Sequence, residues 1–181
     1  MILQPSATSP EYILKAFAAF FPSGFSPLEK AEKPLSAMHC PAQGYAEKLS
    51  ISMNHYFARL KPGIGNAVKR YNWSIVTHDK LFALTGNHIH DDEVVDVELE
   101  KKKELDPAQC WLRVERQVLF KLPQTGAAVF VVKTYLYPLG EVKGEGLGCE
   151  LADAIEGLGE SVGWYKRRGI WGDKVVEFLR C

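Results

Sequence analysis

The stretch CWLRVERQVLFKLPQTGAAVFVVKTYLYPLGEV, residues 110–142, contains two runs of alternating side chains separated by a short break. Apolar side chains alternate with charged or polar ones over residues 112–122, and side chains alternate again over 127–137, which is the period of a half-buried strand. Between the runs, Pro123-Gln124-Thr125-Gly126 supplies the proline and glycine of a tight turn. Pro138 lacks the N–H that a ladder needs and ends the second run. The stretch predicts a long antiparallel hairpin.

Arg116 breaks the pattern of the first predicted strand. It falls in register with Val114 and Val118, on the face that is otherwise apolar. A guanidinium in such surroundings needs a carboxylate, a carbonyl or a bound anion. Two interpretations stay open: a structural arginine satisfied near a sheet edge, or a group that holds an anion beneath a ligand.

The bulk composition favours one soluble domain over residues 1–181. Lysine plus arginine and aspartate plus glutamate are both 22, so no basic excess points to nucleic acid. The four cysteines are scattered without a CxxC pair, which indicates a reducing compartment. The opening residues lack the positive start of a secretory signal, and the apolar run 16–21 is too short to span a bilayer. We therefore expect a cytoplasmic protein with no membrane partner.

His39 lies at the end of a predicted helix. Ser26 is a suitable N-cap, with Pro27 at the first helical position and Glu29 three residues after the cap. Pro34 is expected to kink this helix, whose apolar face ends at His39. The imidazole is either a core or surface histidine held by a backbone carbonyl, or an axial ligand of a haem iron.

The remaining pattern predicts an α+β domain. Residues 12–21 fit either a strand or a short buried helix, residues 45–60 an amphipathic helix that carries His55 off its apolar stripe, and residues 70–76 a strand. Short helices are expected near residues 151–158 and after Asp173.

Residues 85–109 form the most polar interval and are expected to be a polar insertion loop outside the core. His88 and His90 precede three acidic residues, which resembles a metal site. A third ligand at dedicated spacing is missing from this pattern, so a solvated charged loop is the simpler interpretation.

Three strings together resemble one family: FPSGFSPLEKAEKPLSAMH (residues 21–39), RYNWSI (70–75) and LRVERQVLFKLPQTGAAVFVVKTYLYPL (112–139). They are similar to the haem-dependent oxidative N-demethylase alpha-subunit-like proteins, whose domain is a haem-binding PAS fold. The resemblance implies a PAS-like antiparallel sheet with a central long hairpin, helices packed on one face and a helical C-terminus. It also implies that the family's N-terminal part is missing from this chain.

The resemblance further implies a b-type haem that binds O2 beside a small methylated amine of the dimethylamine type. Oxidation would release formaldehyde, with electrons from NADPH delivered through flavin and iron–sulfur partner subunits. On this basis His39 is the expected ligand of the haem iron, and Arg116 and Arg70 are available for the propionates or for polarising O2. Glu115 and Arg116 are the candidate catalytic residues.

Two other classes of function stay open on the sequence. One is a non-catalytic haem sensor of PAS type, in which the same pocket binds a gas. The other is a truncated scaffold without a cofactor. A visible absorption spectrum separates the scaffold from the two haem proteins.

Overall fold

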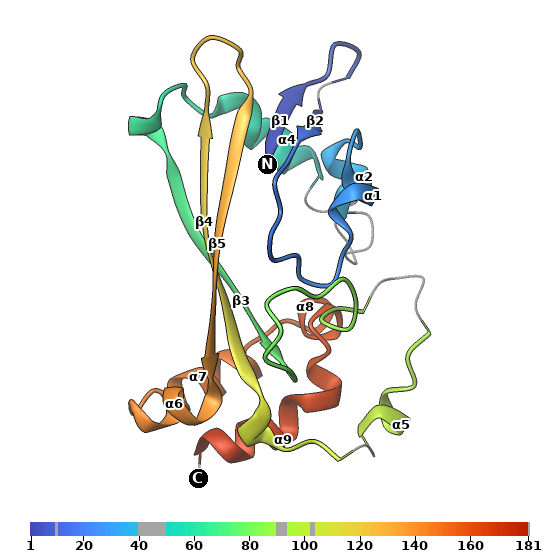
Figure 1. Cartoon of the computed structure of the whole chain (residues 1–181), viewed down its shortest axis with the longest axis vertical. Coiled ribbons are helices and arrows are strands. Elements are labelled where there is room, and N and C mark those ends of the chain that lie inside the picture. The colour runs from blue at the N-terminus through green and yellow to red at the C-terminus, as the bar shows by residue number, and fades with distance from the viewer. Residues whose placement is uncertain (10, 40–49, 90–93, 102–103, 181) are drawn as a thin grey trace.

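The computed structural model describes residues 1–9, 11–39, 50–89, 94–101 and 104–180. Within these residues the chain is a mixed α+β protein built on an open, fully antiparallel sheet (Figure 1). The sheet has five strands: β1 (Ile2–Pro5), β2 (Tyr12–Ala16), β3 (Val68–Val76), β4 (Trp111–Lys121) and β5 (Ala128–Pro138). Their order across the sheet is β2-β1-β5-β4-β3, so β2 and β3 form the two edges.

The predicted hairpin is confirmed as β4 and β5. The pairing runs without a register shift from Trp111↔Pro138 to Lys121↔Ala128. The turn closes through the amide of Gly126, which has a φ of 68° and donates to the carbonyl of Leu122 at 3.1 Å. A non-glycine residue rarely adopts this φ, which explains the glycine of the turn motif. Strand β3 pairs along nearly the whole of β4.

The N-terminal helices differ from the single kinked helix that the sequence predicts. Helix α1 (Pro27–Lys30) and helix α2 (Leu35–His39) are separate. Between them, Glu32 has a φ of 59° and donates its amide to the carbonyl of Leu14, while Lys33 accepts from the Leu14 amide. The backbone groups of Glu32 and Lys33 therefore bond to strand β2 instead of continuing the helix. Pro34 has no N–H to donate to a helical hydrogen bond. Residues 12–21, left open between strand and helix, begin with strand β2.

One hydrophobic core, which we call the N-terminal core, joins the N-terminal half to the end of the hairpin that carries the turn. Helix α4 (Ser50–Arg59) and the 3-10 turn η1 (Ile64–Asn66) complete this half. The buried members of this core come from β1, β2, α2, α4, the residue that follows α4, β4 and β5: Leu3, Tyr12, Leu14, Leu35, Phe57, Leu60, Leu119 and Ala128.

A second hydrophobic core lies at the other end of the hairpin, where the C-terminal helices pack (Figure 1). These helices are α6 (Leu139–Gly144), α7 (Gly148–Glu156), α8 (Glu160–Tyr165) and α9 (Arg168–Arg180), and the short elements α5 (Val97–Lys101) and η2 (Pro107–Gln109) contact α9. The buried members of this core are Ile75, Cys110, Leu139, Ala152, Ile155, Trp171, Val175 and Leu179. None of the described helices is both long and apolar enough to cross a membrane.

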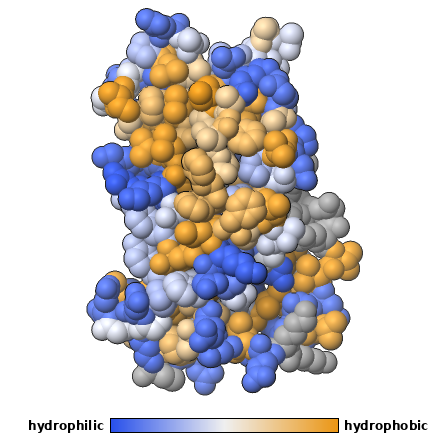
Figure 2. All heavy atoms as spheres, in the orientation of Figure 1, coloured by the Kyte–Doolittle hydropathy of each residue, from blue (hydrophilic) through white to orange (hydrophobic). Residues whose placement is uncertain are grey.

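The two faces of β4 are buried to different extents. We call the side with Arg113, Glu115, Gln117, Leu119 and Lys121, together with their register partners, the inner face. The opposite side, with Leu112, Val114, Arg116, Val118 and Phe120, is the outer face. The sequence predicts the correct alternation, but the more deeply buried side chains belong to the inner face. Arg116 is correspondingly exposed. Figure 2 shows apolar side chains gathered on the surface along the middle of the molecule.

Two loops cover the middle of the inner face, and we call residues 17–25 and 77–89 the cover loops. They are joined by a parallel bridge between Ser23 and Ala83 and by a hydrogen bond of 2.9 Å from Asn87 Nδ2 to Ser23 Oγ. Gly24 has a φ of 72°, and a Cβ on it would lie 2.6 Å from Nδ1 of His88. This close approach leaves room for glycine alone.

The interval 85–109, expected from the sequence to be a polar insertion loop, contains buried residues near its start. Asn87, His88 and Ile89 are buried, and the amide of Ile89 donates to the carbonyl of Tyr165 at 2.9 Å. The local composition is polar, but Asn87 and His88 meet specific partners in the cover loops and α8. His90 and the acidic residues after it lie outside the described residues.

Candidate functional site

A buried polar cluster occupies the inner face between the two hydrophobic cores, with Glu115 at its centre. Register places Asn72 of β3 beside Glu115 of β4. Oε2 of Glu115 accepts hydrogen bonds from Gln117 Nε2 at 3.0 Å and from Asn72 Nδ2 at 3.5 Å. Nε of Arg113 lies 3.8 Å from its Oε1. A carboxylate that is only 18% exposed thus accepts two hydrogen bonds and lies beside the positive charge of Arg113.

Arg113 connects this cluster to the cover loops. Its side chain is 1% exposed, and its two terminal nitrogens donate to the carbonyls of Leu81 at 2.9 Å and Phe21 at 2.8 Å. Burial lowers the pKa of Arg113, and the negative charge of Glu115 opposes that shift. Each of these carbonyls belongs to a different cover loop, so one guanidinium fixes both loops to the sheet.

Lys166 closes the cluster from the edge of the sheet. Its ammonium donates to the backbone carbonyl of Trp73 and to Asn72 Oδ1, and it lies 4.9 Å from the centre of the Trp73 ring. Burial lowers the pKa of Lys166, while Glu115 raises it. The neighbouring Tyr165 stacks on His88 with ring centres 4.3 Å apart, and burial followed by the charge of Glu115 raises the pKa of Tyr165.

His39 is half-buried at the end of α2, and its Nδ1 lies 2.8 Å from the carbonyl of Leu35. Burial is the main cause that lowers the pKa of His39; the Leu35 carbonyl raises it, and the positive charges of Lys30 and Arg70 lower it further. The imidazole is therefore mainly neutral at pH 7. The carbonyl contact fits both interpretations of His39. Histidines that bind metals usually donate the second ring N–H to such a carbonyl.

Arg70 links His39 to the polar cluster. Its Nε donates to Oε1 of Gln117 at 2.5 Å, and Gln117 in turn donates to Glu115. The structure thus brings together three of the residues that the sequence singled out: His39, Arg70 and Glu115.

Arg116 does not join this group. It lies on the outer face in register with Tyr71 and Lys133, whereas Arg70 and Glu115 point to the inner face. Of the two arginines considered for a haem site, Arg70 is therefore the one that lies near His39, while Arg116 is on the opposite side of the sheet. His55, exposed on α4, is outside the cluster, and the described residues contain no group of three potential metal ligands.

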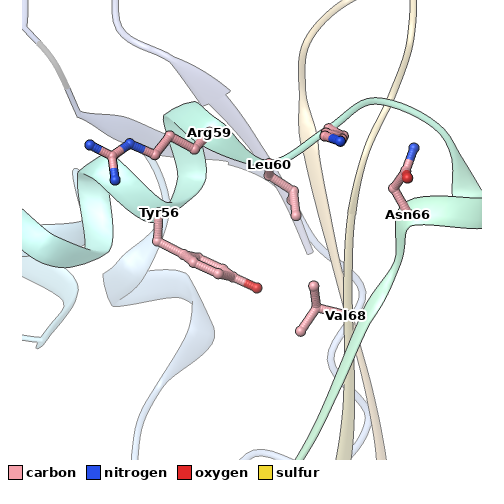
Figure 3. Close-up of a pocket in the computed structure, with 6 residues that line it drawn as sticks. Tyr56, Arg59, Leu60, Asn66 and Val68 are labelled. Atoms are coloured by element: carbon pink, nitrogen blue, oxygen red, sulfur yellow. The ribbon is translucent and has the colours of Figure 1, made fainter.

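Two surface cavities lie elsewhere. One, of about 230 Å³, is lined by residues of α4, η1 and the start of β3, and Figure 3 shows the Tyr56 ring directed toward Val68 while Arg59 points away. The other, of about 430 Å³, lies between Leu105 and Phe178. Neither is lined by His39 or Glu115.

The family model described as "Haem-dependent oxidative N-demethylase, alpha subunit-like" matches residues 1–176 of the chain. The chain belongs to this family. No curated protein matches it. The family's description implies haem and an assembly of more than one kind of subunit.

The residues around His39 fit a haem in their donor chemistry. A neutral imidazole, oriented through Nδ1, is a suitable axial ligand for haem iron. Two cations, Lys30 and Arg70, act on the same imidazole and are suited to the carboxylates of the porphyrin. In this family assignment His39, Arg70 and Lys30 are the residues that would hold the group.

The sequence analysis missed Arg113, Gln117, Asn72 and Lys166. On β4 the first two alternate with apolar residues, which is also the pattern of a solvated strand face. The pairing of β3 with β4 would have been the informative signal, because it brings amide and charged side chains from both strands into adjacent rows. Lys166 directly follows α8, and local sequence carries no information on its contact with β3.

Proposed function

We propose that this chain is a haem-binding subunit that oxidatively demethylates a small methylated amine of the dimethylamine type with O2. The observation that supports it best is the state of His39. Its Nδ1 contacts the Leu35 carbonyl, and burial and the charges of Lys30 and Arg70 lower its pKa, in a chain whose family is described as haem-dependent.

In this proposal the bound haem supplies the redox chemistry that activates O2. His39 would hold the iron through Nε2, since Nδ1 contacts the Leu35 carbonyl and fixes the ring. Arg70 and Lys30 offset the negative charge of the carboxylate groups. Arg116 has no part in this site, because it lies on the outer face.

Glu115 is the proposed binding group for the amine. A dialkylamine is protonated at neutral pH, and a cation in a partly buried site requires a negative partner. The carboxylate of Glu115 is already oriented by Gln117 and Asn72. It would hold the ammonium and accept its proton before oxidation, since the neutral amine is the oxidisable form.

The overall reaction balances with one external reductant. Dimethylamine, O2, two electrons and two protons give methylamine, formaldehyde and water. One methyl carbon is oxidised, and the two oxygen atoms end in formaldehyde and water. In this proposal NADPH supplies the electrons through flavin and iron–sulfur partner subunits, in keeping with a family named for an alpha subunit.

Reconstitution with hemin tests the haem site. We expect a Soret band for the native chain and for His55→Ala, which changes an exposed residue of α4, and a lost or strongly weakened band for His39→Ala. An unchanged spectrum for His39→Ala would assign the ligand to another residue. A native chain that binds no hemin would favour a scaffold.

Dimethylamine turnover tests the role of Glu115. With the reconstituted protein and a chemical or enzymatic reductant, formaldehyde release is measured for the native chain and for Glu115→Gln, which keeps the shape but removes the charge. We expect an intact Soret band and a KM raised by at least about tenfold, because a desolvated charge pair contributes more than 1.4 kcal/mol. A Soret band without amine turnover in the native chain would instead indicate a haem-binding module with a sensing role.

A further inference from the structure

The outer face of the sheet carries positive charge without acidic side chains. Pairing places Tyr71 of β3, Arg116 of β4 and Lys133 of β5 in one row across the sheet. The next row begins with Lys69, beside Val118 and Val131. The outer-face positions of these three strands include no aspartate or glutamate.

Arg116 and Lys133 form a like-charge pair directly opposite one another. Such pairs destabilise a sheet unless an anion lies nearby. Within the described part of the chain, no ion pair includes Arg116, Lys133 or Lys69. Lys133 lies over the ring of Tyr135 at 5.0 Å, which satisfies the ammonium in part but does not neutralise it. The positive charges of Arg116, Lys133 and Lys69 therefore have no carboxylate partner within the described part of the chain.

The residues around this row have the composition of a protein interface. Tyr71 is 67% exposed, Val131 48% and Tyr137 41%. The rings of Tyr135 and Tyr137 lie nearly parallel, with centres 6.2 Å apart. Exposed tyrosine and arginine beside aliphatic side chains are the residue types that contribute most to binding between proteins.

We infer that the outer face is a docking surface for another protein whose contacting surface is acidic with an apolar centre. Charge complementarity identifies the partner's chemistry, since its carboxylates would neutralise Arg116, Lys133 and Lys69. A second copy of the chain would place the same cations opposite each other. A nucleic acid would require more phosphate contacts than three cations supply in a chain with no net charge. The inference does not depend on haem binding.

Site-specific cross-linking tests this surface in the full chain. A photo-reactive benzoylphenylalanine replaces Tyr71, and the chain is cross-linked in cells that naturally make it. The charge-reversed form carries Arg116→Glu and Lys133→Glu. The control carries Arg59→Glu and Lys61→Glu, which give the same change in charge on exposed residues of another surface. Circular dichroism checks that each form is folded, and Arg116→Gln with Lys133→Gln replaces the first if it is not.

The expected result is one cross-linked protein whose attached peptide contains aspartate or glutamate. The yield should fall about tenfold or more in the charge-reversed form and stay unchanged in the control, since juxtaposed like charges oppose association. Changing the partner's carboxylates to lysine should restore cross-linking to the charge-reversed form. Cross-links to the chain itself, to nucleic acid or to nothing would overturn the inference, as would a yield that does not respond to charge reversal.

Discussion

The two faces of strand β4 differ in how deeply they bury polar side chains: the inner face buries them more deeply than the outer face buries its aliphatic ones. The inner face buries Arg113 and Gln117, while the outer face exposes Arg116 among half-buried aliphatic side chains. Both faces belong to the same hairpin and have the same backbone geometry. The difference therefore comes from what covers each face, and not from the strand itself.

On the inner face, the cover loops supply carbonyl groups that a long polar side chain satisfies better than an apolar one. Arg113 donates to one carbonyl in each loop. On the outer face, the C-terminal helices cover one end through Trp73, Ile75 and Leu112, and exposed side chains such as Tyr71 and Val131 follow beyond it. The two loop carbonyls on the inner face favour Arg113 at its position, because a buried carbonyl without a donor is costly.

The largest expected effect is that of Arg113→Ala. The change would leave the carbonyls of Phe21 and Leu81 without their donor and remove the positive charge beside Glu115, and should lower the free energy of unfolding by about 3–5 kcal/mol. The matched control is Arg116→Ala, three residues along the same strand, where an exposed side chain should change stability by no more than about 0.5 kcal/mol. Urea unfolding of both variants measures the difference. Equal losses would show that the two faces are not distinguished in solution.

Leu119→Ala and Val118→Ala compare adjacent residues that face opposite sides. Leu119 belongs to the N-terminal core, so its truncation should cost about 3 kcal/mol, whereas half-buried Val118 should cost about 1 kcal/mol or less. The shift in the urea midpoint, at constant slope, reports each value. A larger loss at Val118 would mean that the outer face is packed more tightly than its exposure indicates.

Ile89→Ala tests whether the cover loops contribute to stability. Ile89 is 2% exposed, but it belongs to neither hydrophobic core, so we expect a loss of about 2 kcal/mol. Val94→Ala, at a fully exposed position of the same interval, is the control and should be neutral. Thermal unfolding of both proteins is sufficient to compare them. A neutral Ile89→Ala would restore the view that the whole polar interval lies outside the core.

The smallest effect concerns the pH dependence of stability at His39. Because burial lowers its pKa in the folded state, the unfolded chain binds the proton first as pH falls. The contribution of neutral His39 is complete above the unfolded pKa of about 6.5 and is lost as pH falls toward the lowered folded value. His39→Gln should therefore lose less stability than the native chain between pH 7.5 and 5.0. Urea unfolding at the two pH values measures the loss for each protein. An equal loss of unfolding free energy in both proteins would contradict a buried neutral imidazole.

Sequence periodicity was sufficient to predict the hairpin, β3 and the α+β class, because strand alternation and turn residues are local signals. The same signals could not decide which side of β4 is buried. Arg113 and Arg116 are both arginines within an alternating run, and only the long-range contacts with residues 21 and 81 distinguish them. His39 was singled out by its position at the end of an apolar helix face and Arg70 through the haem interpretation, and their proximity depends on how α2 packs against the rest of the fold.

The contact of Lys166 with the carbonyl of Trp73 has a consequence for self-association. Strand β3 is an edge of the sheet, and an edge with unpaired backbone groups is a template for adding a strand from another molecule. The ammonium of Lys166 occupies one of these outward carbonyls, and its side chain lies over the adjacent ring. A variant that loses Lys166 should therefore have a more accessible edge, and a concentrated solution of it should form β-rich aggregates sooner than the native chain.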